Sequence, residues 1–244
     1  MKKTLLTICL VWMCFSLSAQ KIIDLSGKWS FSIDRQDNGE KEKWFSHTLN
    51  DFINLPGSMP EKLKGDEVTA KTQWTGSLYD SSYYYNPYME KYRKEGNIKF
   101  PFFLTPDKHY VGAAWYQKEV NIPADWKGER ILLFLERPHI ETTVWVNGQK
   151  TGMQNSLCVP HQYDITRYVR PGKCTITIRV DNRIKEINVG PDSHSITDQT
   201  QGNWNGIVGR ICLQTTPKTY FDDIQIYPEP EQKLARVKVV IKGT

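Results

Sequence analysis

The chain of 244 residues carries 32 basic and 27 acidic residues, and 39% of its residues are hydrophobic. The charges are scattered, so the basic stripe that nucleic-acid binding needs is missing, and no nucleic-acid partner is expected. Beyond the N-terminal run described next, no stretch approaches the roughly 20 apolar residues of a membrane helix.

The N-terminal residues have the pattern of an export signal. Two lysines precede an apolar run over 4–17, and small residues lead up to Ala19, which favours cleavage before Gln20. Lipidation at Cys14 is the alternative, but the residues before it lack the small side chains of such a site. We therefore expect residues 1–19 to be a signal peptide, and export to the periplasm or the outside of a Gram-negative bacterium.

The first strand signal after the leader lies over 27–33. Trp29, Phe31 and Ile33 alternate with polar residues there, which predicts a half-buried strand. The periodicity is then lost over about 61–109, where the chain is rich in Tyr, Asn, Pro and Lys. We interpret that stretch as an irregular insertion.

Strand signals return after residue 110. Apolar alternation or continuous apolar runs predict strands over 114–122, 130–136, 142–146, 175–180, 209–214 and 224–227. Asn147-Gly148 is a strong signal for a tight hairpin, because both residues tolerate positive φ. Short strands at regular spacing with almost no helical pattern predict an all-β, antiparallel β-sandwich of the jelly-roll kind.

The C-terminal residues look like a boundary followed by a further strand. Proline and glutamate alternate over 228–231, which is typical of an extended, solvated linker, and 236–241 reads as one more strand. A single strand cannot bury its own face. We therefore expect a sandwich over 20–228, and 229–244 to be a linker and the first strand of a second domain.

Three blocks of sequence carry a family resemblance. They are YVGAAWYQKEVNIPADWKGERILLFLE (110–136), HIETTVWVNGQKTG (139–152) and PHQYDITRYVRPGKCTITIRVDNR (160–183). They resemble the N-terminal sugar-binding domain of the family-2 glycoside hydrolases, which include β-galactosidases, β-glucuronidases and β-mannosidases. The resemblance implies a galactose-binding-like jelly roll, followed in the complete enzyme by an immunoglobulin-like domain and a (β/α)8 barrel.

Glycoside hydrolysis usually needs two carboxylates that flank the scissile bond. The resemblance implies that both are barrel glutamates and that one directly follows an asparagine, but this chain has no Asn-Glu dipeptide. Glu119, Glu136 and Glu141 are expected at exposed strand positions. We therefore expect no catalytic residue in this chain.

No metal or cofactor is expected either. His109, His139, His161 and His194 are dispersed, and for His139 and His161 structural hydrogen bonds in loops are the better interpretation. Cys158, Cys174 and Cys212 are too few and too widely spaced for a disulfide framework or a zinc site.

The strongest candidate for sugar contact is the segment 193–209. Trp204 offers a flat aromatic face, with amides and a carboxylate nearby that suit sugar hydroxyls. The candidate substrate-binding residues are Asp198, Gln199, Asn203, Trp204 and Asn205. The alternative is a structural turn whose tryptophan packs under the sheet or against another domain.

Other aromatic residues have structural explanations. The tyrosines of the insertion and Trp74 are expected to form a small core or an interface, with a glycan-binding surface as the alternative. Core packing is expected for Trp29, Trp115, Trp126 and Trp145.

Together these patterns predict the sugar-binding part of an exported enzyme that removes terminal β-linked sugars, galactosides or glucuronides, with the barrel missing from this chain. The alternatives are a stand-alone carbohydrate-binding module and an inactive structural domain.

Overall fold

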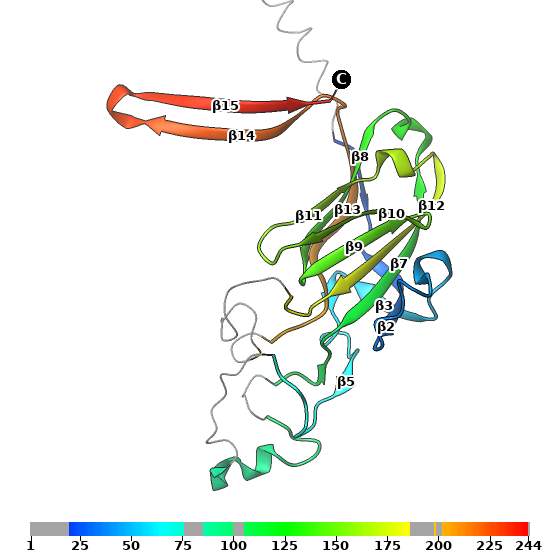
Figure 1. Cartoon of the computed structure of the whole chain (residues 1–244), viewed down its shortest axis with the longest axis vertical. Helices are drawn as coiled ribbons and strands as arrows, with labels where there is room; N and C mark the ends of the chain where they lie inside the picture. Colours follow the sequence, from blue (N-terminus) through cyan, green and yellow to red (C-terminus); the bar gives the residue numbers. More distant parts are fainter. Residues whose placement is uncertain (1–19, 76–84, 100–104, 186–197, 199–201, 244) are drawn as a thin grey trace, which may run out of the picture.

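The computed structural model describes residues 20–75, 85–99, 105–185, 198 and 202–243, and the predicted signal peptide lies outside them. Two antiparallel sheets face one another, and a two-stranded hairpin extends away from them (Figure 1). Over the described residues, no helix has the length and apolar character needed to cross a membrane.

The larger sheet has six strands. Their order is β10 (Gln149–Asn155), β9 (Glu141–Val146), β12 (Gly172–Asp181), β7 (Ala113–Ile122), β2 (Gly27–Asp34) and β3 (Asp51–Leu55). The predicted hairpin joins β9 to β10: Val146 pairs with Gln149, while Asn147 and Gly148 take φ values of 50° and 77°. The turn chemistry read from the sequence is therefore confirmed.

The smaller sheet has five strands. Its order is β1 (Ile22–Asp24), β13 (Gly206–Thr216), β8 (Arg130–Pro138) and β11 (His161–Asp164), with β4 (Gly57–Ser58) paired to the start of β13. The β13–β8 register shifts between Val208 and Ile211, which marks a bulge close to the start of β13.

The main core lies between the two sheets, because each sheet turns alternate apolar side chains inward. Trp29, Phe31, Ile176 and Ile178 come from the larger sheet and pack with residues such as Leu133 of the smaller one. Trp126 joins this core as well. The expected all-β sandwich is thus confirmed.

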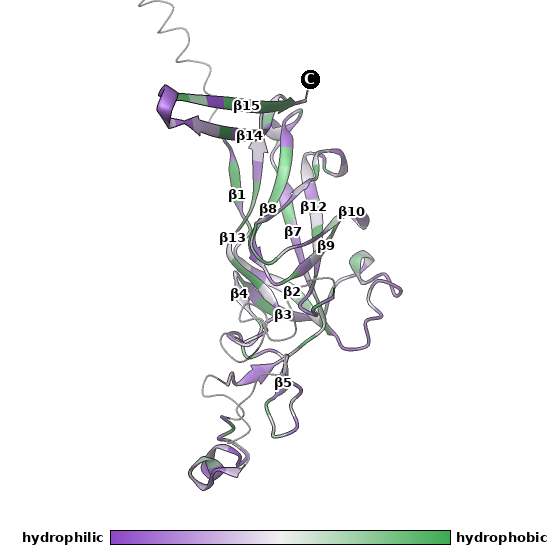
Figure 2. Cartoon of the chain, turned by 60° about the vertical axis from the view of Figure 1, so that its left-hand side comes forward, coloured by the Kyte–Doolittle hydropathy of each residue, from purple (hydrophilic) through white to green (hydrophobic). Residues whose placement is uncertain are grey.

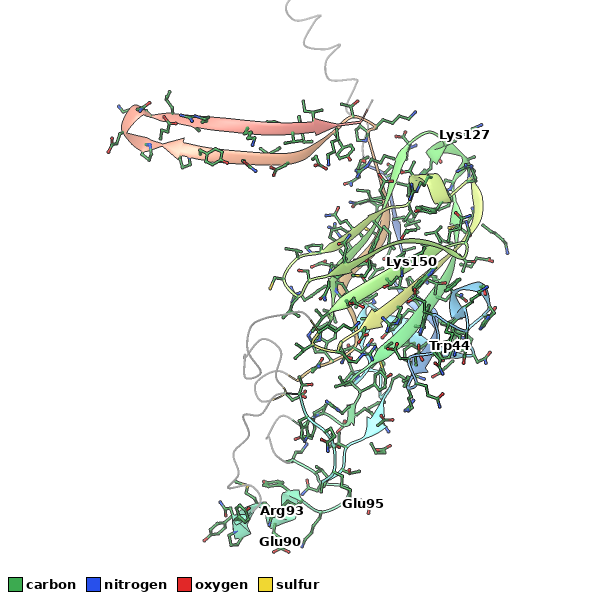
Figure 3. The ribbon with its side chains drawn as sticks, in the orientation of Figure 1. Trp44, Glu90, Arg93, Glu95, Lys127 and Lys150 are labelled. Atoms are coloured by element: carbon green, nitrogen blue, oxygen red, sulfur yellow. The ribbon has the colours of Figure 1, made fainter. Side chains whose placement is uncertain are left out.

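A second cluster lies on the face of the larger sheet that points away from the main core. Trp115 and Trp145 stack there with ring centroids 4.9 Å apart. The segment that follows β2 covers them, with Trp44 and Phe45 packed against the pair (Figure 3). All four tryptophans expected in the core are buried, but two of them belong to this separate cluster.

The C-terminal strands differ from the sequence prediction. The strand expected at 224–227 lies in β14 (Tyr220–Glu229), which pairs with β15 (Leu234–Lys242) and with no strand of either main sheet. The Pro-Glu-Pro-Glu stretch lies at the end of β14 and in the short turn η5 (Pro230–Gln232) that links the two strands. Proline and charge end β14 at a hairpin turn here, and the sandwich bound expected at residue 228 stays a prediction.

The described parts of the insertion contain little regular structure. Two short strands, β5 (Asp66–Glu67) and β6 (Lys108–His109), pair with one another, and a 3-10 helix, η2 (Pro87–Tyr92), lies at the far tip of the molecule. Glu90, Arg93 and Glu95 are at that tip (Figure 3). The remaining 3-10 turns are η1 (Trp44–Ser46), η3 (Ala124–Trp126) and η4 (Thr166–Tyr168).

Candidate sugar-binding site

The candidate site forms where four segments of the chain meet at one end of the sandwich. β7 begins at this end, β12 ends there, and β13 starts there after the loop that carries Asp198 and Trp204. Residues from the insertion, Thr75 and His109, reach the same place. The strand order therefore brings together residues that are far apart in sequence.

Asn205 anchors the loop to the sandwich. Its side-chain amide donates to the backbone carbonyls of Gly112, at 2.9 Å, and Val180, at 3.0 Å. Its Oδ1 accepts a 2.7 Å bond from the hydroxyl of Tyr116. Asn205 is fully buried and satisfies groups on β7, on β12 and just before β7, so its role in this structure is to fix the backbone next to Trp204.

Asn203 forms a second anchor with Asn182, a residue that the sequence analysis did not single out. Asn182 donates from Nδ2 to Oδ1 of Asn203 at 3.0 Å, and Asn203 donates back to the carbonyl of Asn182 at 3.0 Å. Asn203 also donates to the Thr75 hydroxyl at 3.0 Å. The only sequence signal for Asn182 is its position directly after a predicted strand.

Asp198 joins the insertion to the loop before β13. Its carboxylate accepts a 2.6 Å bond from the backbone N–H of Thr75 and a 2.5 Å bond from that of Asn203. Only 1% of the side chain is exposed. The polar atoms of Asp198, Asn203 and Asn205 thus have protein partners, and their contact with a sugar stays a prediction. Gln199 lies outside the described residues.

Trp204 is the partly exposed member of the group, in contrast to its buried neighbours. Its ring lies 4.5 Å from that of His139, whose Nδ1–H donates a 2.7 Å bond to the Trp204 carbonyl. Burial lowers the pKa of His139, with the Trp204 carbonyl and the Asp198 charge acting against it. A hollow of about 390 Å³ beside Trp204 is lined by Pro60, Pro106 and other residues.

The histidines expected to be structural do make structural bonds. His139 lies between β8 and β9 and fixes the Trp204 backbone. His161, in β11, donates from Nε2 to the Ser156 carbonyl at 3.1 Å and contacts Thr142 Oγ1 at 2.6 Å.

The three glutamates considered for catalysis are held by separate partners. Glu119 pairs with Lys173 at 2.9 Å on the surface, and Glu136 accepts a 2.8 Å bond from the backbone N–H of Arg210. Glu141 is buried rather than exposed, which corrects the expectation for that residue; Lys185 binds it at 2.8 Å. None of these contacts pairs one glutamate with another across an open site, as glycoside hydrolysis would need.

Glu141 belongs to a larger ion-pair cluster beside the candidate site. Asp181 binds Arg179, Arg183 and Lys185 at 3.1, 2.6 and 2.9 Å. Burial alone would raise the pKa of Asp181, but hydrogen bonds from Arg183 and Lys185 and the charge of Arg179 hold that pKa well below its usual range. With Asp37 and Glu141 included, three basic residues face three acidic ones, so the cluster is balanced.

Within the described part of the chain, no group of three or more His, Cys, Asp or Glu side chains is arranged to hold a metal ion. Cys174 and Cys212 are buried and free, as expected for small hydrophobic residues, and Cys158 is exposed. Another hollow, of about 800 Å³, lies at the opposite end of the sandwich, where Trp126, Arg130 and Tyr220 line it.

Comparison with known proteins identifies the family. The model described as "Glycosyl hydrolases family 2, sugar binding domain" matches residues 22–217. Human β-glucuronidase is 25% identical over 251 residues, which cover 91% of this chain and 33% of that protein. The β-glucuronidase of Paenibacillus borealis is 27% identical over 222 residues, which cover 85% and 31%.

Solved structures give the same fold. The β-glucuronidase of an uncultured Clostridium species aligns with a TM-score of 0.62 at 20% identity, over 93% of this chain and 34% of that one. Ruminococcus gnavus β-glucuronidase in complex with D-glucuronic acid aligns with a TM-score of 0.60 at 17% identity, over 93% and 35%. The chain spans about a third of the length of the relatives it matches. By its family match, it belongs to family 2 of the glycosyl hydrolases, as their sugar-binding domain.

Proposed function

We infer that the chain is the sugar-binding domain of an exported glycoside hydrolase that removes terminal β-linked sugars, and that the sugar is a glucuronide. The family match supports the domain, and the similarity to the β-glucuronidases compared above supports the substrate. Export rests on the pattern of residues 1–19.

The observation that carries the proposal is the setting of Trp204. Its ring is partly exposed beside a hollow, while Asn203 and Asn205 on either side are buried and fully bonded. A flat aromatic surface on a rigid backbone suits the apolar face of a sugar ring. In this proposal Asp198 and the two asparagines hold the surface in place.

The chemistry of hydrolysis is assigned to other domains of the same enzyme. Glu119, Glu136 and Glu141 have separate structural partners, and the family resemblance assigns the acid/base and the nucleophile to a barrel. The β14–β15 hairpin supports such downstream partners. One of its faces carries Phe221, Ile224, Ile226, Val237, Val239 and Ile241, all exposed. Figure 2 shows hydrophobic residues in both strands of this hairpin. An apolar sheet face of this kind calls for a covering layer.

The test is to compare the 244-residue chain with the product of the complete reading frame. We expect the complete protein to hydrolyse nitrophenyl β-D-glucuronide faster than nitrophenyl β-D-galactoside, and the 244-residue chain to hydrolyse neither. Turnover by the short chain that a point substitution abolishes would place catalysis in this domain and overturn the proposal. Preference for the galactoside would leave the domain assignment standing and overturn the substrate.

A further inference from the structure

His109 carries an unexplained polar atom close to the candidate site. Its side chain is only 7% exposed, and its Nε2 has no hydrogen-bond partner among the described residues. The Trp74 ring lies 4.7 Å from the imidazole. A buried nitrogen without a partner costs free energy, so its retention needs a reason.

Oδ2 of Asp198, which lies 3.4 Å from Nε2 of His109, offers such a reason. The Asp198 carboxylate is buried and accepts two backbone N–H bonds, but within the described part of the chain His109 is the only basic side chain at ion-pair distance from it. A buried carboxylate is stabilised by a positive charge at this range.

The other ionisable groups around the pair do not supply that charge. Burial lowers the pKa of His139, and its Nδ1–H is bound to the Trp204 carbonyl. Asp66 faces His109 across the β5–β6 pair and binds Arg35, while Glu67 binds Lys108. Burial raises the pKa of Tyr110, so its hydroxyl stays neutral.

We propose that His109 is a positioning residue: when protonated, it binds the Asp198 carboxylate and locks Thr75 of the insertion to Asn203, the residue before Trp204. The inference rests on the proposed function only where it concerns sugar binding: the lock holds the residues beside the bound sugar in fixed positions. The lock itself is a property of this chain and requires no sugar.

Hydrogen exchange tests the lock directly, because the backbone N–H groups of Thr75 and Asn203 are the two donors to Asp198. The 244-residue chain is compared with His109→Phe, which keeps a ring beside Trp74 and removes the nitrogen, and with His109→Gln, which keeps an N–H donor. His47→Phe, at an exposed histidine, is the matched control. Exchange is measured for all four proteins at the same pH, and the rates are corrected for intrinsic exchange.

We expect the protection of both amides to be about tenfold lower in His109→Phe than in the wild type. In His109→Gln it should be intermediate, and in His47→Phe unchanged from the wild type. The amide of Ile176, in the core, should keep its protection in all four proteins. Protection of Thr75 and Asn203 that is unaffected in His109→Phe would overturn the inference.

Calorimetry with D-glucuronic acid then separates the two proposals. If amide protection depends on His109 but the chain does not bind the sugar, this inference stands and the result counts against the proposed function. If the wild type and His109→Phe bind the sugar equally although the variant has lost the lock, the lock does not contribute to sugar binding.

Discussion

The backbone N–H of Thr75 donates a 2.6 Å hydrogen bond to the carboxylate of Asp198, 123 residues further along the chain. This contact joins the insertion to the loop that carries Trp204. Two parts of the sequence that look independent, one rich in tyrosine and one rich in amides, therefore build one site. The predictions below test how that site and its support behave.

Replacement of Trp204 by alanine should weaken binding of a β-glucuronide or of free glucuronic acid by roughly tenfold, since an aromatic contact contributes on the order of 1 kcal/mol. The fold should survive, because the bond from His139 uses the backbone carbonyl of residue 204. Isothermal titration calorimetry measures the affinity. Trp44→Ala, on the outer face of the larger sheet, is the control and should bind as the wild type does. Equal affinity in folded Trp204→Ala would exclude this residue from the site.

Asn205→Ala should destabilise the sandwich by about 3 kcal/mol, because it leaves three buried groups on Gly112, Val180 and Tyr116 without their partner. Urea unfolding followed by tryptophan fluorescence gives the free energy of unfolding. The exposed Asn54, in β3, offers a control: Asn54→Ala should change stability by less than about 0.5 kcal/mol. Similar values for the two variants would show that the Asn205 bonds contribute little.

Asp181→Asn should cost about 3–5 kcal/mol at neutral pH, because the variant leaves Arg179, Arg183 and Lys185 without their shared partner. Asp107→Asn, at an exposed aspartate, is the control.

The same variant has a defined pH dependence. The pKa of Asp181 is depressed in the folded state, so its contribution is present above the unfolded value of about 3.9 and is lost as the pH falls below it. The stability difference between wild type and variant should therefore be constant from about pH 7 to pH 5 and shrink in stronger acid. A difference that grows in acid would contradict this assignment.

The apolar face of the hairpin should make the chain self-associate. Ile226 and Val237 lie opposite one another there and are 65% and 54% exposed. Replacement of both by lysine should reduce association in sedimentation velocity experiments, because it breaks the apolar patch. Gln225→Lys adds a charge to the other face of the same strand and should leave association unchanged. If both variants behave alike, charge rather than the apolar face controls association.

Much of the sandwich was predictable, because its strands are half-buried and show the period-two pattern. β7, β8, β9 and β12 lie where alternation or apolar runs placed them. β10 was missed, since Gln149–Asn155 is a polar edge strand with little alternation. The strand expected at 224–227 is present in β14, but its pairing with β15 could not be predicted, because periodicity does not say which strand will be the partner.

The site was only partly predictable for a related reason. Trp204 and its amide neighbours stood out by composition, but their roles depend on distant partners. Asn182 has only its position after a predicted strand as a signal, and Thr75 and His109 have no local signal for a role at the site. The fold brings Asn182 to Asn203, and Thr75 and His109 to Asp198. The burial of Glu141 was missed because the cluster that holds it combines residues 37, 179, 181 and 185.

The bonds of Asn205 have a consequence for engineering. These bonds fix the residue after Trp204 to β12 and to the start of β7. The sandwich by itself therefore sets the position of the Trp204 indole. Libraries that vary Pro60 and Pro106, which line the hollow beside Trp204, should therefore change what surrounds the indole without relocating it. The domain offers a fixed aromatic platform onto which different specificities can be grafted.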